Sequence, residues 1–186
     1  PFRQDHVIHL KMSGIEQTIA DDGGAPARFI LKKTVVLVGM MGAGKTAVGR
    51  AVAAKLGAPF LDSDAEIEAA ANLSVPEIFT RDGEAFFRKR EAEVIDRLLA
   101  GDPCILSTGG GAFLTETVRA AIAEKGAAVW LDASLDTLWE RVRHKDTRPL
   151  LRTENPRQTL SDIYDVRVPI YAQAGIRATI TNDASI

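Results

Sequence analysis

The sequence contains a single cysteine, Cys104, so no disulfide can form within the chain. This scarcity is typical of proteins from reducing compartments, and we expect a cytoplasmic location. No apolar run approaches the ~18 residues that a membrane-spanning helix needs, and the N-terminus does not resemble a signal peptide. The sequence therefore predicts a protein without membrane attachment.

An excess of charge of either sign is also missing, since the formal net charge is only −2. Without a basic field, the chain is not expected to bind nucleic acid, and any anionic ligand must be held by local groups. Hydrophobic residues make up 46% and charged residues 26% of the 186 residues, as in an ordinary folded domain. No long apolar face is left over once the core is assigned, which favours a monomer.

Two regions differ in pattern. Residues 1–33 are polar, include a linker at 21–27, and are interpreted as an N-terminal extension in which 15–20 could form a short helix. From Thr34 to the last residue, 186, strands alternate with helices, which predicts a three-layer α/β/α domain around a five-stranded parallel sheet. The strands are expected at 34–38, 60–61, 104–108, 127–131 and 178–181, and the helices at 45–56, 64–72, 74–77 onward, 84–99, 115–125, 134–143 and 157–174.

A glycine-rich turn follows the first of these strands. Residues 39–46 read G-M-M-G-A-G-K-T and match the phosphate-binding P-loop, between an apolar strand and an amphipathic helix. Backbone N–H groups of such a loop surround phosphate oxygens, while Lys45 reaches the β- and γ-phosphates and the Thr46 hydroxyl ligates Mg²⁺. We therefore assign ATP binding to six consecutive residues: Gly42, Ala43, Gly44, Lys45, Thr46 and Ala47.

Two carboxylates follow the second predicted strand, at the edge where open α/β sheets bind ligands. Asp62 is placed to hold a Mg²⁺-bound water. Asp64 is placed to receive the hydroxyl of an acceptor, orient it and accept its proton. The alternative interpretation is that either carboxylate simply caps the following helix.

Three consecutive glycines, Gly109, Gly110 and Gly111, follow the third predicted strand. Without side chains, they allow a ligand or a neighbouring group to approach the backbone closely and to meet its N–H groups. The alternative is a flexible turn.

Three arginines are candidates for binding an anionic acceptor and the ATP phosphates: Arg88, Arg148 and Arg167. A guanidinium can hold a carboxylate or a phosphate through two parallel hydrogen bonds, which an ammonium cannot. Glu91 lies three residues from Arg88 on the same predicted helix and could fix its rotamer. Each of these arginines could instead be a solvated surface group.

Taken together, these motifs resemble the shikimate kinase family, in their order and spacing, over roughly residues 34–181. The resemblance rests on G-M-M-G-A-G-K-T at 39–46, D-S-D at 62–64, F-R-x-x-E at 87–91, G-G-G at 109–111, R-P-L-L at 148–151 and R-x-P-x-Y at 167–171. It implies the nucleoside-monophosphate-kinase-like P-loop fold. It also implies transfer of the γ-phosphate of ATP to the 3-hydroxyl of shikimate, in the biosynthesis of aromatic amino acids.

The resemblance further implies roles for single residues. Asp62 would lie in the outer shell of Mg²⁺ and Asp64 would contact the shikimate hydroxyls. Arg88 and Arg167 would hold the shikimate carboxylate, and the three glycines would line the acceptor pocket. Arg148 would sit on a mobile lid at about 144–157 and reach the ATP phosphates, with Arg143 or His144 near the adenine. The family's helix after the last strand has no counterpart in this sequence.

Two other functions remain open at this point. The chain could be another small-molecule kinase of the same fold, such as a gluconate kinase, although Arg88 and Arg167 suit a carboxylate on a compact ring. It could also be a module that binds ATP without transferring its phosphate. The presence of Lys45, Asp64 and Arg148 argues against that reading.

Overall fold

The central feature of the computed structural model, which describes residues 8–12, 15–19, 28–144 and 149–180, is a five-stranded sheet. Its strand order is β5-β6-β4-β7-β8, and every pairing is parallel. The strands are β4 (Thr34–Val38), β5 (Phe60–Asp62), β6 (Ile105–Ser107), β7 (Gly126–Ala133) and β8 (Ile176–Ile180). The predicted number, order along the chain and orientation of the strands are confirmed.

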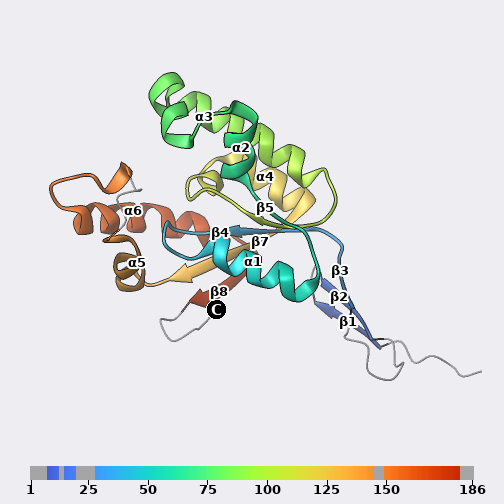
Figure 1. Ribbon diagram of the computed structural model, residues 1–186. Coiled ribbons are helices and arrows are strands. Elements are labelled where there is room, and N and C mark those ends of the chain that lie inside the picture. The colour runs from blue at the N-terminus through green and yellow to red at the C-terminus, as the bar shows by residue number, and fades with distance from the viewer. Residues whose placement is uncertain (1–7, 13–14, 20–27, 145–148, 181–186) are drawn as a thin grey trace, which may run out of the picture.

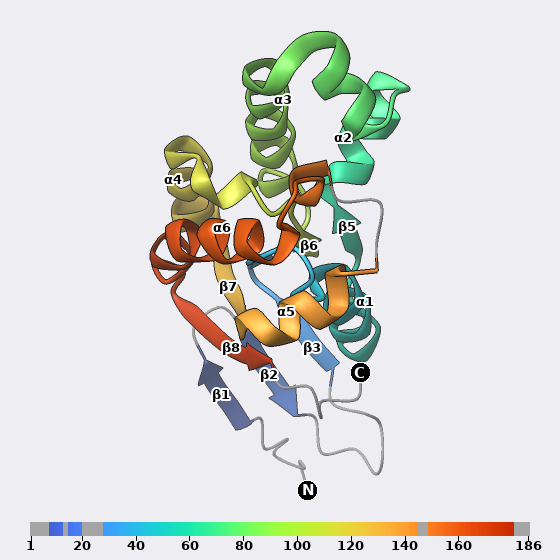
Figure 2. The ribbon, with the colours of Figure 1, turned by 90° about the vertical axis from the view of Figure 1, so that its left-hand side faces the viewer.

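Helices cover both faces of this sheet (Figures 1 and 2). The helix α1 (Lys45–Leu56) lies on one side, and α3 (Val75–Leu99), α4 (Glu116–Lys125) and α6 (Pro156–Tyr171) lie on the other. The shorter helices are α2 (Ser63–Ala71), which packs on α3, and α5 (Leu135–Val142), with two single 3₁₀ turns, η1 (Ala112–Leu114) and η2 (Pro149–Leu151). The predicted three-layer α/β/α architecture is therefore confirmed.

Burial explains the continuous apolar pattern of the central strand. All five residues of β4 are buried, because helices cover both faces of a strand that lies between β6 and β7. A smaller separate cluster, Ile67, Ile78 and Phe87, holds α2 against α3. The molecule thus has a main core between the sheet and its covering helices and a second, small core between α2 and α3. These two helices carry part of the site.

The prediction of a helix at 15–20 is wrong. Residues Ile15–Ile19 form β2, the middle strand of an antiparallel sheet with β1 (Ile8–Met12) and β3 (Arg28–Leu31). The segment has a neighbouring strand on each side to satisfy its backbone, whereas so short a helix would be marginal. The predicted linker at 21–27 lies outside the described residues. Figure 1 shows this sheet beyond the N-terminal end of β4, on the opposite side from the P-loop.

The helix α3 combines two predicted helices, the one opened at 74–77 and the one at 84–99. It is interrupted at Gly83, whose backbone (φ 83°, ψ 168°) is not helical. Its start is fixed by Glu77, which accepts a hydrogen bond of 2.8 Å from the backbone N–H of Ser74. Within the described part of the chain, no helix is both long and apolar enough to span a membrane.

Candidate active site

The P-loop joins the C-terminal end of β4 to α1. Gly44 is the N-cap residue of α1 and adopts a left-handed conformation (φ 91°), which favours glycine. Among the described residues, no side chain caps the first turn of α1, and that turn contains no acidic residue. The unpaired N–H groups and the positive end of this helix therefore suit phosphate.

Two side chains from the first turn of α1 meet the ends of neighbouring strands. The ammonium of Lys45 donates hydrogen bonds to the carbonyls of Gly39 (2.8 Å) and Met40 (3.0 Å), so it is folded over the loop. The hydroxyl of Thr46 donates to Oδ2 of Asp62 (3.1 Å) and lies 3.3 Å from Oγ of Ser107. These oxygens suit Mg²⁺, which usually takes only one or two ligands from the protein and the rest from phosphates and water.

Asp62 caps the following helix, which is one of the two roles between which the sequence left a choice. Its Oδ1 accepts hydrogen bonds from the backbone N–H groups of Asp64 (3.1 Å) and Ala65 (3.5 Å) and so caps α2. Its other oxygen faces Thr46. A single carboxylate thus fixes the start of the helix and contributes an oxygen to the predicted metal site.

Asp64 has the properties expected of a group that receives a ligand. Its Oδ1 is buried without a hydrogen-bond partner among the described residues. Burial raises the pKa of this carboxyl, and repulsion by the neighbouring Asp62 raises it further, whereas Lys45 acts in the opposite direction. A carboxylate with a raised pKa is a stronger proton acceptor, so Asp64 is suited to take the proton of a hydroxyl group.

The three glycines bring the predicted acceptor-binding residues together, and each glycine lies beside a different one. A Cβ on Gly109 would lie 2.7 Å from Oδ1 of Asp64, and a Cβ on Gly110 would lie 3.8 Å from Nη1 of Arg167. A Cβ on Gly111 would overlap the guanidinium of Arg88. Glycine is therefore needed at positions 109 and 111, because charged side chains pack directly against the backbone there, whereas a Cβ at Gly110 would make only ordinary contacts.

Two buried residues support this arrangement. Glu91, with a side chain 1% exposed, accepts a 2.7 Å hydrogen bond from Nη1 of Arg88, which confirms the predicted pairing. Burial raises the pKa of Glu91 to about 7, against the effect of Arg88. Tyr171, which the sequence analysis did not single out beyond its motif, is fully buried and donates a hydrogen bond to the carbonyl of Gly110.

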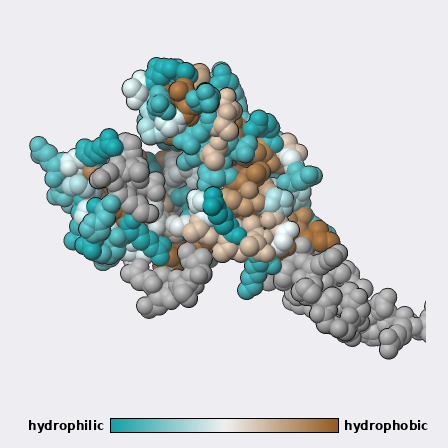
Figure 3. All heavy atoms as spheres, viewed as in Figure 1, coloured by the Kyte–Doolittle hydropathy of each residue, from teal (hydrophilic) through white to brown (hydrophobic). Residues whose placement is uncertain are grey.

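A cavity of about 500 Å³ extends from the phosphate loop to part of the predicted acceptor site. Its volume lies in the range of small-molecule sites. Hydrophilic side chains gather over α3 and over α6 on the face seen in Figure 3. The cavity is lined by Met41, Gly42, Gly44, Lys45, Thr46, Ala47, Asp62, Asp64, Ser107, Thr108, Gly109, Gly110 and Arg141. Three predicted acceptor-binding residues, Asp64, Gly109 and Gly110, therefore share one space with the phosphate loop, whereas Arg88, Gly111 and Arg167 do not line it.

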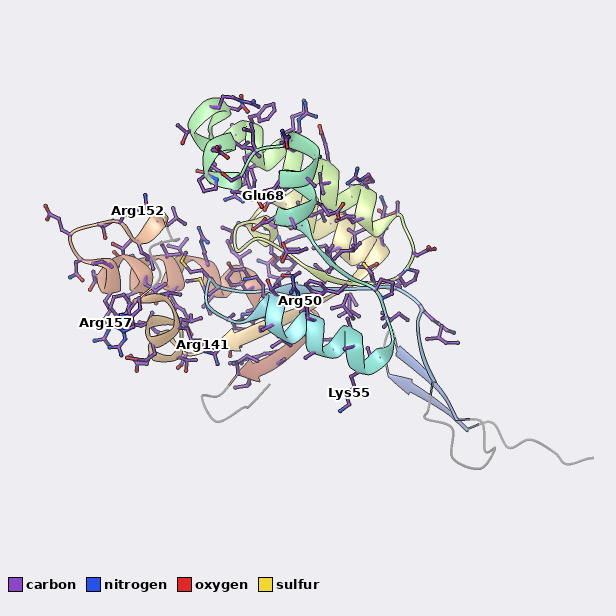
Figure 4. The ribbon with its side chains drawn as sticks, viewed as in Figure 1. Arg50, Lys55, Glu68, Arg141, Arg152 and Arg157 are labelled. Atoms are coloured by element: carbon purple, nitrogen blue, oxygen red, sulfur yellow. The ribbon has the colours of Figure 1, made fainter. Side chains whose placement is uncertain are left out.

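Arg141, which the sequence analysis missed, lines this cavity, whereas the predicted Arg143 pairs with Glu140 at 2.8 Å. Nη1 of Arg141 lies 3.4 Å from the carbonyls of Gly42 and Ala43, beside the P-loop (Figure 4). Helical spacing was the available signal, because Arg141 is three residues from the buried Leu138 and so shares its side of α5.

The predicted lid at about 144–157 is described only in part. Arg148, assigned to the ATP phosphates, lies outside the described residues. The described remainder contains η2, whose Leu150 is 52% exposed, and the start of α6. Arg157 on α6 pairs with Asp136 on α5 at 2.9 Å and so connects the two helices on either side of this segment (Figure 4).

Comparisons with known proteins agree with this geometry. The family model described as shikimate kinase matches residues 41–186. A shikimate kinase of Ruegeria pomeroyi is 64% identical over 177 residues, which cover 94% of this chain and 89% of that protein. A shikimate kinase of Cereibacter sphaeroides is 65% identical over 146 residues, which cover 78% of this chain and 73% of that protein.

Solved structures show the same relationship. A shikimate kinase from Acinetobacter baumannii in complex with shikimate superposes with a TM-score of 0.76 at 39% identity, covering 82% of this chain and 85% of that one. A gluconokinase from Sinorhizobium meliloti reaches a TM-score of 0.50 at 20% identity, covering 82% and 84%, which shows a common fold alone. By its motifs, its fold and these relatives, the chain belongs to the shikimate kinase family.

Proposed function

We propose that this protein transfers the γ-phosphate of ATP to the 3-hydroxyl of shikimate, giving shikimate 3-phosphate and ADP, in the biosynthesis of chorismate and the aromatic amino acids. The observation that carries the proposal is the single cavity that Lys45 and Thr46 share with Asp64 and Gly109. A phosphate donor and a hydroxyl acceptor can lie next to each other there.

On the phosphate side, the loop and α1 do most of the binding. Backbone N–H groups at Gly42–Thr46 hold the phosphates, and Lys45 neutralises the charge that develops on the transferring group. Thr46 and Asp62 would hold Mg²⁺, which supplies charge neutralisation between the β- and γ-phosphates when it is bound. Arg141 lies beside the same loop and is assigned to the nucleotide, in place of Arg143.

On the acceptor side, charged side chains bind the acid. Arg88 and Arg167 hold the carboxylate of the acid, and Gly109–Gly111 allow it to approach the backbone closely. Asp64 orients the hydroxyl and takes its proton as the oxygen attacks the γ-phosphorus, the bond to ADP breaks, and ADP leaves. The raised pKa of Asp64 favours this proton transfer.

We further propose the boundaries of the kinase domain and its oligomeric state. The kinase domain spans 34–186, with residues 1–33 as an extension and a lid at about 144–157 that brings Arg148 onto the phosphates and excludes water. The enzyme works as a cytoplasmic monomer that binds small molecules and no nucleic acid. Size-exclusion chromatography with light scattering tests the oligomeric state.

Acceptor-dependent release of ADP tests the function. We would measure ADP formation from Mg·ATP with shikimate, with gluconate and with nucleoside monophosphates. Turnover with shikimate alone supports the proposal. Turnover with gluconate instead keeps a P-loop kinase but replaces the acceptor. Binding of ATP without ADP release for any acceptor would reduce the protein to a nucleotide-binding module.

A further inference from the structure

Two carboxylates of very different exposure hold the guanidinium of Arg88. Nη1 donates to Glu91 at 2.7 Å, and Glu91 is 1% exposed. Nε and Nη2 both donate to a single oxygen of Glu84 at 3.2 Å, and Glu84 is 68% exposed. The bond to Glu91 is short and buried, whereas the bonds to Glu84 are long and in solvent. Glu84 is therefore the partner that can be exchanged.

We propose that Glu84 is an internal competitor for the carboxylate of the acceptor. Before the acid binds, Glu84 occupies the Nε–Nη2 edge of Arg88, and the acid must displace it. Glu84 therefore sets the affinity for the acceptor and weakens the binding of anions that offer a carboxylate and nothing else. The inference rests on the proposed function, in which Arg88 holds the carboxylate of the acid.

The surroundings of Arg88 leave few of its N–H donors open to the acid. A guanidinium has five N–H donors, of which Glu84 takes two and Glu91 takes one. One face of Arg88 lies against Gly111, and its central carbon lies 5.3 Å from the ring centre of Phe87 and 5.8 Å from that of Phe79. The Nε–Nη2 edge offers two parallel donors, which is the geometry that a carboxylate prefers.

Repulsion makes the competition independent of the way in which the acid docks. If the acid takes the Nε–Nη2 edge, it replaces Glu84 directly. If it takes the other end of the guanidinium, it joins Glu84 and Glu91 on one cation, and the acid and Glu84 repel each other. In both cases a neutral side chain at position 84 makes binding of the acid easier. The effect is modest, because the exposed side chain of Glu84 is screened by water.

The position of Glu84 in the chain makes its release easy. It follows directly on Gly83, where α3 is interrupted, and so begins the second helical segment. A carboxylate in the first turn of a helix is stabilised by the unpaired N–H groups there. The released side chain therefore keeps a favourable environment, and the exchange leaves the charge around Arg88 unchanged.

Glu84→Gln is the test, with Glu93→Gln as the matched control, because Glu93 lies on the same helix and pairs with Arg90 at 2.6 Å, both side chains being half-exposed. We expect Glu84→Gln to lower the KM for shikimate about two- to five-fold, with kcat and the KM for ATP unchanged. Calorimetry should give the same gain for shikimate and none for shikimate methyl ester, which has no carboxylate to compete. Glu93→Gln should change none of these values, and thermal unfolding checks that both variants fold.

Arg88→Lys separates the two proposals. If it leaves the KM for shikimate unchanged, Arg88 does not hold the carboxylate, and both the proposed acceptor site and this inference are wrong. If it raises that KM while Glu84→Gln leaves it unchanged, only the competition is wrong. A higher KM in Glu84→Gln would make Glu84 a residue that positions Arg88, which also overturns the competition. An equal gain for the methyl ester would do the same.

Discussion

The two halves of the active site are built in opposite ways. The phosphate half comes mainly from one continuous segment, 39–47, and relies on backbone N–H groups and the end of a helix, with Lys45 as its main side chain. The acceptor half comes from segments spread between Asp64 and Tyr171 and relies on charged side chains packed beside three glycines. A contiguous motif is therefore visible in a sequence, whereas the acceptor half needs the fold to assemble it.

The two halves also differ in what holds them in place. The loop of the phosphate half is fixed by the buried strand β4 and by α1. The acceptor half contains the buried carboxyls of Asp64 and Glu91, each with one oxygen that has no hydrogen-bond partner among the described residues. Such groups cost stability and are sensitive to pH. We therefore expect substitutions in the phosphate half to lower turnover, and substitutions in the acceptor half to change stability or the kinetics with shikimate.

The largest expected effect breaks the phosphate half. Lys45→Met should lower kcat about 10²- to 10³-fold or more, because the transferring group loses a positioned cation, while the fold stays intact. Lys55→Met is the control, since Lys55 is in the last turn of the same helix and points away from the cavity (Figure 4). Steady-state rates with shikimate test both variants. Near-normal turnover of Lys45→Met would remove Lys45 from the mechanism.

The next effect concerns the stability of the acceptor half as a function of pH. The pKa of Glu91 rises from 4.5 to about 7 on folding, so the folded protein binds this proton more strongly than the unfolded chain. Its contribution to the free energy of unfolding is therefore fully present below about pH 4.5 and is lost as the pH rises through 7. The loss between pH 5 and pH 8 should be about 2–3 kcal/mol.

Glu91→Gln removes this titration. Denaturant unfolding of the wild type and of this variant at pH 5 and pH 8 should show that the wild type loses more stability than the variant over this range. An equal change in both proteins would mean that Glu91 does not titrate in this range.

A smaller effect tests the close packing at the glycines. Gly109→Ala places a Cβ 2.7 Å from Oδ1 of Asp64 and 3.0 Å from Oε1 of Glu91, so both carboxyls must move. We expect kcat/KM for shikimate to fall about 10- to 100-fold, with little change in the KM for ATP. Gly101→Ala, whose Cβ would meet only one carbonyl at 3.5 Å, is the control. An equally large increase in the KM for ATP would contradict the division of the active site into two halves.

The smallest effect concerns the backbone that carries Glu84. Gly83 has φ 83° and ψ 168°, a region that other residues rarely adopt, although a Cβ there would contact nothing within 4 Å. Gly83→Ala should therefore lower the free energy of unfolding by about 1–2 kcal/mol through strain alone. Gly175→Ala also meets open space, without this strained φ, and should cost less. Equal losses in both variants would rule out strain at position 83.

Local patterns along the chain carried most of the prediction of the fold. The apolar run of β4, Gly57 after α1 and the capping box at Ser74 each act between near neighbours, and the strand and the two helix boundaries predicted there are confirmed. The segment 15–19 was misread because a six-residue window does not show which partners will satisfy its backbone. Pairing with β1 and β3 decided that it is a strand.

By itself, the sequence determined the chemistry available to this protein. The spacing of the P-loop, the pair Asp62 and Asp64, and the three glycines follow from the chain alone, because each is a short motif with its own physical demand. Only the tertiary structure decided which distant groups meet. It placed Arg141 at the cavity instead of Arg143 and put charged groups beside Gly109–Gly111. Such contacts depend on burial and direction in space, which spacing along a chain does not specify.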